Sequence, residues 1–160
     1  MKSRLPDTFD AIVDAPGFAL GIRCEGDDWV DEIFYLPPRA AQAARTPLAM
    51  ETARQLRAYL ADPDFIFGLP AKPAGTLFQR RVWQQIAAIP RGETRSYGEV
   101  ARALNNAPRA VGQACGANPL PLIVPCHRVI AAGGGLGGFS RHGGGFLVEV
   151  KRWLLAHEQR

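Results

Sequence analysis

The sequence predicts an α+β protein of two small domains, the first with an antiparallel sheet and the second mostly helical. In the first half, apolar residues alternate with small or polar ones, as in strands, and one amphipathic helix follows. The second half shows short apolar stripes at helical spacing, each preceded by a capping signal. The segment 68–75, rich in glycine and proline, separates the two patterns as a linker. We therefore expect a sheet-plus-helix domain at residues 1–75 and a helical domain at residues 76–160.

The first domain is expected to contain two strands and a helix. The first strand is predicted by the alternation of Phe18, Leu20, Ile22 and Cys24, and the second spans residues 30–36 after a turn at Asp27–Asp28. Thr46 is the expected N-cap of the helix, with Pro47 in its first position. The helix residues expected to face the strands are Ala49, Ala53, Leu56 and Leu60. No pattern in this domain indicates chemistry.

Capping boxes predict where two helices of the second domain begin. Thr76 and Gln79 open a helix that residues 90–92 end, and its apolar stripe consists of Phe78, Val82, Ile86 and Ile89. Ser96 and Glu99 open a shorter helix that runs to residue 104. Both signals place a side-chain acceptor before an apolar run, so these two starts are well defined.

A further helix is expected from about Arg109 to Ala117, after the break at Asn105–Asn106 and the initiating Pro108. Two short helices joined by a tight turn predict a helix-turn-helix, although many helical hairpins share this pattern. The second of these helices is unusually poor in long side chains: Ala110, Gly112, Ala114, Gly116 and Ala117. Small residues allow close approach either of a packed neighbour or of a DNA groove, and both interpretations stay open.

Charge divides the chain in the same way. Residues 1–75 hold 8 Lys/Arg and 11 Asp/Glu, a balance of −3, whereas residues 76–160 hold 11 and 4, a balance of +7. A basic domain next to an acidic one is typical of a protein whose basic part meets a polyanion, but a solvated basic surface is equally compatible.

Composition and cysteine spacing restrict the compartment. The chain has 160 residues, 47% hydrophobic and 21% charged, with no apolar run of the ~18–20 residues that a membrane span needs. Its first ten residues contain no apolar core like that of a signal peptide, so a cytoplasmic protein is expected. Cys24, Cys115 and Cys126 form no CxxC pair and no even-numbered framework, which predicts reduced thiols and no metal site.

The segment from Asn118 to Ile130 carries the clearest chemical signal. Its apolar run 120–124 suits a short buried strand that delivers Cys126 and His127 to its end, directly after Pro125. An imidazole next to a thiol can accept its proton and stabilise the thiolate. Neighbouring side chains of a strand point to opposite faces, so a contact between the two needs a turn after Pro125 or a bridging water. An inert buried cysteine is the alternative.

Several motifs in order resemble the O6-alkylguanine-DNA alkyltransferases. The similarity runs from Thr76 to Glu158 and includes Phe78-Gln79-Arg80, Val82-Trp83, Ile89-Pro90, Gly92-Glu93, Ser96-Tyr97, Arg109-Ala110-Val111-Gly112, Asn118-Pro119, Pro125-Cys126-His127-Arg128-Val129 and Trp153-Leu154-Leu155-Ala156-His157-Glu158. The first half is similar to the family only in size and pattern. Members of this family repair DNA by taking an alkyl group from a damaged base onto their own cysteine.

The resemblance implies a role for each catalytic position. Cys126 would accept the alkyl group, and His127 would take the thiol proton through a water. Glu158 would orient and charge-balance His127, and Asn118 would hold the turns around the site. Tyr97 would donate a proton or hydrogen bond to N3 of the leaving base. No cofactor is implied, and the cysteines and histidines of the family's occasional zinc site have no counterpart in the first half.

The resemblance also implies binding residues. Those for DNA are Ser96, Tyr97, Arg109, Ala110 and Gly112, with Arg109 filling the gap that a flipped nucleotide leaves. Those around the base are Cys115, Pro121, Arg128, Val129, Phe139 and Ser140, with Arg128 tying down the active-site segment. The implied partner is double-stranded DNA with alkylated bases. The resemblance also implies a monomeric protein that does not bind a membrane and is found at the nucleoid while it is bound to DNA.

Two departures from the family concern the substrate pocket. Phe139 stands where the family usually has a tyrosine, whose hydroxyl is thought to polarise the base oxygen. The segment between Ser140 and Lys151 is about five residues longer than the common pattern, through the insertion Arg141-His142-Gly143-Gly144-Gly145. The preferred alkyl group and any activity on O4-alkylthymine therefore stay open, whereas the nucleophile is retained.

Three other functions remain to be separated from alkyl transfer. A non-catalytic lesion-binding protein would not transfer the alkyl group, and a cysteine hydrolase using Cys126 and His127 would turn over repeatedly. A transcription regulator would bind a chosen sequence, and a dimer is the usual form of such a protein. An alkyltransferase differs from all three, because its product is a thioether that water cannot hydrolyse, so each molecule acts once.

Overall fold

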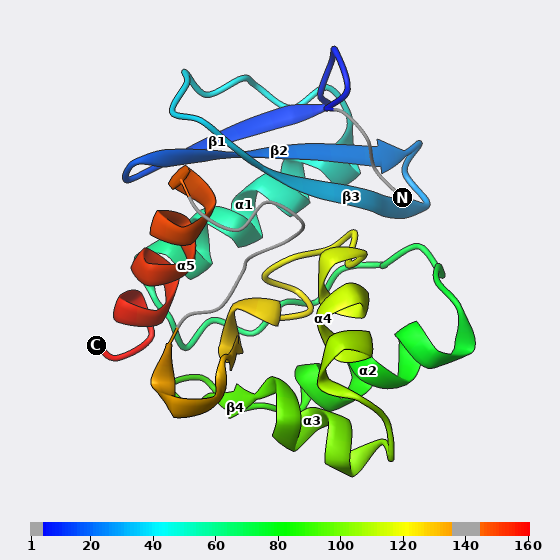
Figure 1. Ribbon diagram of the computed structural model, residues 1–160. Helices are drawn as coiled ribbons and strands as arrows, with labels where there is room; N and C mark the ends of the chain where they lie inside the picture. The colour runs from blue at the N-terminus through cyan, green and yellow to red at the C-terminus, as the bar shows by residue number, and fades with distance from the viewer. Residues whose placement is uncertain (1–4, 136–144) are drawn as a thin grey trace. The chain divides into compact units, whose positions relative to one another are not determined.

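The computed structural model describes residues 5–135 and 145–160, and the chain divides into two compact units, Met1–Pro73 and Ala74–Arg160 (Figure 1). Phe139, Ser140 and residues 141–144, for which the sequence predicts pocket roles or an insertion, lie outside the described residues. Each unit has its own apolar core. In the described part of the chain, none of the helices combines the length and hydropathy needed to cross a bilayer.

The first unit is a three-stranded antiparallel sheet with one helix. The strands β1 (Ala11–Ala15), β2 (Phe18–Glu25) and β3 (Trp29–Leu36) pair in chain order, and β2 begins after a tight turn in which Gly17 has φ 82°. Of these, β2 and β3 were predicted from the alternation. The strand β1 was not, because its buried Ala11, Ile12 and Val13 are consecutive rather than alternating.

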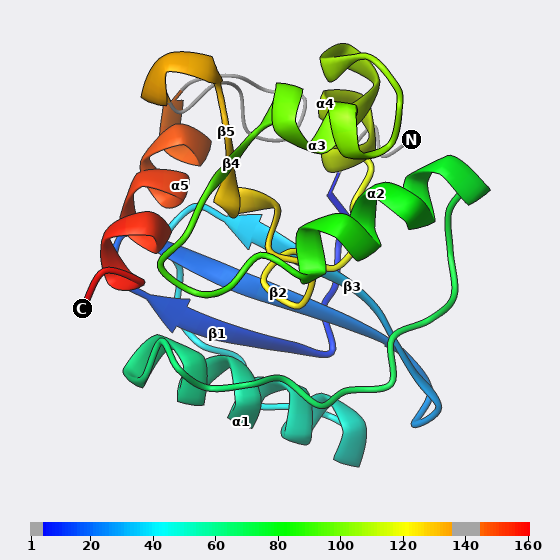
Figure 2. The same ribbon diagram turned by 90° about the horizontal axis from the view of Figure 1, so that it is seen from below.

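Helix α1 (Pro47–Ala61) packs along the sheet, as Figure 2 shows. Thr46 caps it as predicted, since its side chain accepts a hydrogen bond from the Ala49 amide. The buried face contains the expected Ala49, Ala53 and Leu56, and also Leu48, Thr52, Gln55 and Tyr59, whereas Leu60 is only half-buried. This face closes the core of the first unit.

Part of the segment predicted as a linker, residues 68–75, is hydrogen-bonded to the first unit. Val30 N donates to Pro70 O at 2.7 Å, and Lys72 N donates to Val30 O at 3.0 Å, so residues 70–72 extend the edge of the sheet at β3. Gln55 also exchanges two hydrogen bonds with the backbone of Gly68. Extended chain at an open sheet edge satisfies backbone groups that would otherwise stay unpaired, which the glycine and proline content did not reveal.

The second unit consists of helices and short turns around one core. Its elements are α2 (Leu77–Ala87), β4 (Arg95–Ser96), α3 (Tyr97–Ala103), α4 (Pro108–Gly116), the 3-10 turn η1 (Cys126–Arg128), β5 (Val129–Ile130), the 3-10 turn η2 (Ala132–Gly134) and α5 (Gly145–His157). Both predicted capping boxes are present, at Thr76/Gln79 before α2 and at Ser96/Glu99 before α3. The two short strands β4 and β5 pair in parallel.

The core of the second unit gathers residues from α2, α3, α4 and the Cys126 segment: Val82, Ile86, Ile89, Val100, Ala101, Val111, Ala114, Cys126 and Val129. Three of the four residues predicted to form the stripe of α2 are in it, and Phe78 packs at its border. Trp83 Nε1 donates to Ala114 O at 2.9 Å and ties α2 to α4. Helices α3 and α4 pack together across a turn in which Asn105 has φ 53°.

The strand predicted at residues 120–124 is wrong. Pro121 within the segment, and Pro119 and Pro125 beside it, have no backbone N–H to donate, and Leu122 adopts φ 76°, so the segment forms a compact series of turns instead. Leu120 and Leu122 are nevertheless buried, as their apolar character indicates. The turns lead the chain to Cys126.

Candidate active site

Cys126 begins a 3-10 turn directly after a chain reversal at Pro125. Pro125 has φ −80° and ψ 67°, the conformation of an inverse γ-turn, and Cys126 N donates to Val124 O at 2.8 Å across it. The sequence left two ways for Cys126 and His127 to cooperate, a turn after Pro125 or a bridging water, and a turn is present. Both side chains are buried, with Cys126 5% exposed.

Asn118 organises the segment around the thiol. Its Nδ2 donates to Val124 O at 2.9 Å and to the Cys126 sulfur at 3.2 Å, and its Oδ1 accepts from Leu120 N at 2.9 Å. The buried amide therefore fixes both ends of the turn region and places an N–H donor on the sulfur. A donor at this position stabilises negative charge on a thiolate.

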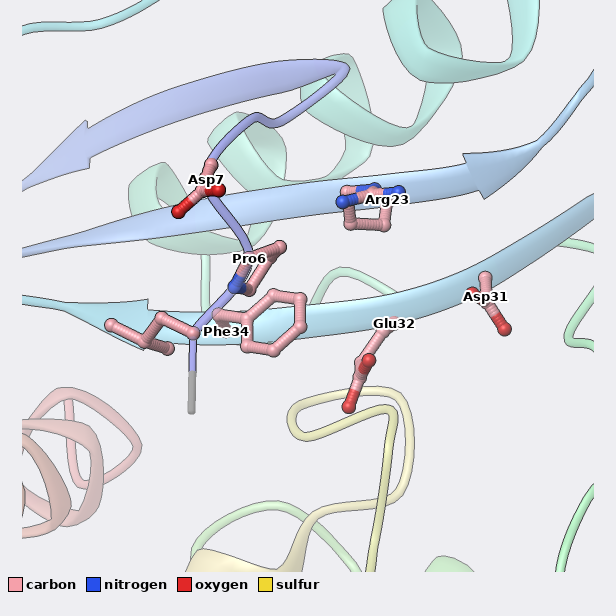
Figure 3. A pocket seen from close by; sticks show the side chains of 7 residues that line it. Pro6, Asp7, Arg23, Asp31, Glu32 and Phe34 are labelled. Atoms are coloured by element: carbon pink, nitrogen blue, oxygen red, sulfur yellow. The ribbon is translucent and has the colours of Figure 1, made fainter. Parts of the chain in front are cut away.

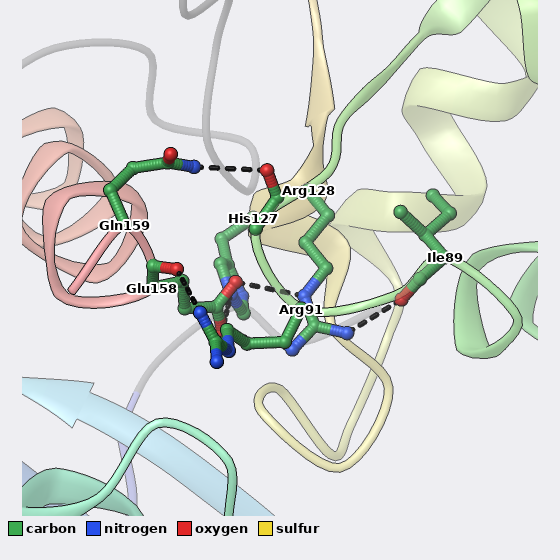
Figure 4. Close-up of polar contacts among 7 residues, drawn as sticks. Ile89, Arg91, His127, Arg128, Glu158 and Gln159 are labelled. Atoms are coloured by element: carbon green, nitrogen blue, oxygen red, sulfur yellow. Dashed lines mark hydrogen bonds and ion pairs between the residues drawn. The ribbon is translucent and has the colours of Figure 1, made fainter.

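His127 is held by a carboxylate. Its Nε2 lies 2.8 Å from Glu158 Oε2, and both side chains are only 1% exposed (Figure 4). Arg128 binds the same carboxylate through two hydrogen bonds, at 2.9 and 3.0 Å. Because this ionised carboxylate can only accept, Nε2 carries the proton of the imidazole, and Nδ1 keeps a lone pair.

The Nδ1 atom of His127 is buried and has no hydrogen-bond partner among the described residues. Burial lowers the pKa of His127, and the Arg128 and Lys151 charges lower it further, while the contact with Glu158 opposes this. The ring is therefore neutral in the resting protein. A neutral imidazole with a free lone pair is a base that can accept one proton, and Glu158 can balance the charge that results.

Glu158 also links the site to the rest of the second unit. Arg128 donates from its other side to Ile89 O at 2.6 Å, and Arg91 donates to the Glu158 carbonyl at 3.0 Å (Figure 4). Gln159 donates to Gly92 O at 2.9 Å. These bonds fix the end of the chain against the segment after α2, so the carboxylate has one defined position.

The Cys126 thiol is protonated at rest. Hydrogen-bond contact with Cys115 and burial of the sulfur both raise the pKa of Cys126 well above its ordinary value, against smaller opposite effects of Asn118 and Lys151. A base is needed to generate the nucleophile. The sequence predicted a thiol that a neighbouring imidazole can activate. In the structure the thiol proton must be removed during the reaction, because the pKa of Cys126 is raised.

Tyr97, the first residue of α3, lies beside a buried lysine that sequence reasoning missed. Burial raises the pKa of Tyr97, so its hydroxyl stays a proton donor. Lys151 Nζ lies 5.7 Å from the centre of the Tyr97 ring and donates to Val129 O at 2.8 Å. The Lys151 side chain is fully buried, and burial lowers the pKa of Lys151 to about 8. Its position three residues before the buried Leu154, on one face of α5, was the available signal.

The remaining predicted residues occupy different environments. Cys115 raises the pKa of Cys126 and packs at the border of the core. Pro121 is half-buried in the turns, and the Val129 side chain lies wholly in the core, while its carbonyl accepts from Lys151. The Ser96 hydroxyl accepts from Glu99 N as the cap of α3. Arg109 is exposed at the start of α4, and a Cβ at Gly112 would meet no described atom within 4 Å.

A hollow in the first unit offers a different chemistry. It is lined by Leu5, Pro6, Asp7, Arg23, Asp31, Glu32 and Phe34 (Figure 3). These residues include three carboxylates but neither a thiol nor an imidazole, the groups that the sequence analysis singled out. The candidate site is therefore the cluster around Cys126 in the second unit.

Comparison with known proteins decides the family. The sequence profile of the family described as 6-O-methylguanine DNA methyltransferase, DNA binding domain, matches residues 77–160, more than half of the chain. The chain belongs to this family. The resemblance inferred from the sequence motifs is thereby confirmed.

Similar methyltransferases cover both units. The constitutive methylated-DNA–protein-cysteine methyltransferase of Bacillus subtilis is 41% identical over 135 residues, which are 83% of this chain and 78% of that protein. The crystal structure of Mycobacterium tuberculosis OGT in complex with DNA has a TM-score of 0.76 at 40% identity, covering 92% of this chain and 91% of that one. The O6-methylguanine-DNA methyltransferase of Pyrococcus kodakaraensis has a TM-score of 0.57 at 25% identity, covering 93% and 97%. The α+β fold class is confirmed by these structures.

Proposed function

We propose that this protein repairs DNA by transferring a methyl or other alkyl group from O6-alkylguanine to its own Cys126 in a single turnover. The observation that carries the proposal is the buried Cys126 thiol, bound by the Asn118 amide and followed by the His127–Glu158 pair, in a member of this methyltransferase family. The shared family supports the reaction, and the geometry is compatible with the role proposed for each group.

The first step is removal of the thiol proton. The lone pair of His127 Nδ1 can accept this proton. No hydrogen bond joins the Cys126 and His127 side chains directly. We propose that a water relays the proton from the sulfur to Nδ1. The imidazolium that forms is balanced by Glu158, while the Asn118 N–H stabilises the thiolate left behind.

The second step is in-line displacement at the alkyl carbon. The Cys126 thiolate forms the new S–C bond as the C–O bond to the base breaks, and the electron pair leaves on the guanine. A hydrogen bond from the Tyr97 hydroxyl to the base stabilises this developing anion, and the raised pKa of Tyr97 keeps that proton in place. The product is a thioether, which has no carbonyl for water to attack, so the protein is consumed.

The DNA contact is proposed for the basic second unit. The oxygen that carries the alkyl group is unreachable inside a duplex, so the nucleotide must leave the stack at a cost of a few kcal/mol. Arg109 is exposed at the start of α4, where it can occupy the space left by that nucleotide. The open space beside Gly112 favours the interpretation that small residues of α4 admit a close DNA backbone rather than a packed neighbour.

Every proposed catalytic group comes from one copy of the second unit, so a monomer is sufficient for the reaction. The proposed partner is duplex DNA with alkylated bases, and no step needs a cofactor or a membrane. A protein with this partner is expected to work at the nucleoid, in the cytoplasm. These assignments follow from the proposed chemistry.

The test is the stoichiometry of transfer from a duplex with one O6-[³H-methyl]guanine. We expect label to move to the protein up to one equivalent and then stop. Label that leaves the DNA beyond one equivalent indicates a hydrolase, and tight binding without any transfer indicates a lesion-binding protein. The Cys24→Ser variant, which alters the thiol of the other unit, is the matched control and is expected to transfer one equivalent.

A further inference from the structure

The segment that follows α2 binds the backbone around Glu158 as well as its side chain. Arg91 Nη1 donates to Glu158 O at 3.0 Å, and Gln159 Nε2 donates to Gly92 O at 2.9 Å (Figure 4). Each of these hydrogen bonds joins positions 67 residues apart in the sequence. Arg91, Gly92 and Gln159 together form a clamp on the end of α5.

The clamp supplies a hydrogen bond that α5 cannot make for itself. The helix ends at His157, and Glu158 N still donates to Leu154 O at 3.1 Å. The last carbonyls of a helix have no amide donors within the helix, so they need partners from elsewhere. Arg91, which is half-buried, provides this partner to Glu158 O and also donates to Arg160 O at 3.4 Å. Its positive charge is favourable at a helix C-terminus.

Gly92 allows the two segments to approach closely. It has φ 87°, a backbone conformation that glycine adopts without steric cost. A Cβ at this position would lie 3.4 Å from Glu158 O and 4.0 Å from Gln159 Nε2. The backbone of the segment after α2 is thus nearly in van der Waals contact with the end of α5, and the clamp leaves that end little room to move.

We propose that Arg91 is a positioning residue for alkyl transfer, because by holding the Glu158 carbonyl it keeps the Glu158 carboxylate on Nε2 of His127. This inference rests on the proposed function, in which His127 accepts the thiol proton. The carboxylate oxygen lies 2.8 Å from Nε2, and since N–H···O bonds extend to about 3.2 Å, a displacement of about 0.5 Å weakens this contact. Arg128 holds the carboxylate oxygens, and Arg91 holds the backbone that carries them.

The two arginines act on different parts of Glu158, so loss of Arg91 should loosen the base without dismantling it. Arg128 keeps its two bonds to the carboxylate and its bond to Ile89 O at 2.6 Å in such a variant. A misplacement of about 1 Å can cost about a hundredfold in rate, so a loosened contact should cost about tenfold.

Single-turnover transfer from a methylated duplex, measured over a range of duplex concentrations, separates positioning from DNA binding. Arg91→Met keeps the apolar part of the side chain but removes the donor, and its maximal rate should fall about tenfold. Arg95→Met is the matched control, because it removes the same charge from the same segment, and Arg95 contacts Glu93 and Thr94 instead. It should keep the natural maximal rate, and both variants should change the half-saturating duplex concentration equally.

Exchange of the His127 Nε2 proton with water, followed by NMR, is a readout that a merely structural role would not change selectively. The contact with Glu158 protects this proton, and in Arg91→Met it should exchange at least about tenfold faster, because the end of α5 opens locally. The amide proton of Val82, in the middle of α2, should keep its exchange rate. Equal acceleration of both protons would show a loosening of the whole unit and would overturn the proposal.

Gln159→Leu tests the same inference by another route, and it replaces Arg91→Met if that variant does not fold. It removes the bond to Gly92 O, so the His127 proton should again exchange faster and the maximal rate should fall. A protected His127 proton and natural transfer rates in both variants would contradict the positioning role and leave the proposed function intact. Faster exchange in the variants of a protein that transfers no alkyl group would support the positioning role and contradict the proposed function.

Discussion

His127 and Glu158 form a buried pair, 2.8 Å between Nε2 and Oε2, in which each side chain is 1% exposed. Arg128 neutralises the same carboxylate, so the pair carries no uncompensated charge while the imidazole is neutral. This arrangement directs the lone pair of Nδ1 away from Glu158. The position of the base therefore depends on a carboxylate 31 residues further along the chain.

The first prediction is that Glu158→Gln impairs both transfer and stability. An amide removes the charge that balances imidazolium and can donate to Nε2, which would shift the proton of His127 onto Nδ1. We expect the transfer rate to fall about a hundredfold. We expect the free energy of unfolding in urea to fall by about 3 kcal/mol, because Arg128 loses its buried partner.

The matched control for that variant is Glu149→Gln. Glu149 is in α5, the helix that ends directly before Glu158, but is exposed and pairs with the exposed Arg152. An exposed ion pair contributes little, so this variant should change stability by less than about 1 kcal/mol. Equal effects of the two substitutions would contradict the role given to Glu158.

The second prediction concerns the pH dependence of stability through Lys151. Its pKa is about 8 in the folded protein and 10.5 ordinarily, so the unfolded chain binds more protons between these values. Burial of Lys151 therefore costs stability below pH 8, and this cost is relieved as the pH rises from 8 towards 10.5. Relative to Lys151→Met, the free energy of unfolding should rise over this window by at most about 1.4 kcal/mol per pH unit.

Urea unfolding of both proteins at pH 7, 8, 9 and 10 provides the measurement. Lys72→Met serves as the comparison, because the contact with Glu25 raises the pKa of Lys72, and its effect should stay constant across the same window. A difference between natural protein and Lys151→Met that does not vary with pH would show that Lys151 is not destabilised in its charged form.

The third prediction separates base extrusion from chemistry. Arg109→Ala should slow repair of a methylated duplex by about tenfold or more, because Arg109 is proposed to occupy the space of the extruded nucleotide. Transfer from free O6-benzylguanine avoids that cost and should change less than about twofold. Arg152→Ala, an exposed arginine of α5, is the charge-matched control. Equal losses with both substrates would place Arg109 in the pocket or the fold instead.

The fourth prediction is that Tyr97→Phe weakens both reactions. Its hydroxyl is proposed to stabilise the leaving base, which is needed in duplex and free base alike, and loss of such a donor costs about a hundredfold in rate. Single-turnover rates at equal protein concentration measure this. An unchanged rate with O6-benzylguanine would remove Tyr97 from the chemical step, and an unchanged urea midpoint would show that the fold is intact.

Local signals predicted much of the second unit. The side-chain acceptors Thr76 and Ser96 fixed the starts of α2 and α3, because a cap and its partner lie three residues apart in any such sequence. Strand geometry made a turn after Pro125 one of two ways to join Cys126 and His127, the other being a bridging water, and a turn is present. In contrast, the strand predicted at 120–124 was wrong, since three prolines and the left-handed Leu122 outweigh an apolar pattern.

What the sequence missed depends on contacts between distant segments. Lys151 was not singled out, because a lysine is usually exposed, and only the fold brings Val129 O and the Tyr97 ring to its ammonium. The effect of Cys115 on the pKa of Cys126 likewise depends on the turns between them. Strand β1 escaped because its apolar residues are consecutive. The catalytic roles themselves came from family resemblance and stay predictions until variants are measured.

Cys126 is the proposed alkyl acceptor, and the most direct measurement of this assignment is the location of the transferred group. After reaction with duplex DNA bearing O6-methylguanine and digestion with trypsin, peptide 110–128 should gain one methyl mass, and its fragmentation should place that methyl on Cys126. Cys115, in the same peptide, should stay free to react with iodoacetamide. A methyl group on Cys115 or in peptide 24–39 would contradict the assignment of Cys126 as the acceptor.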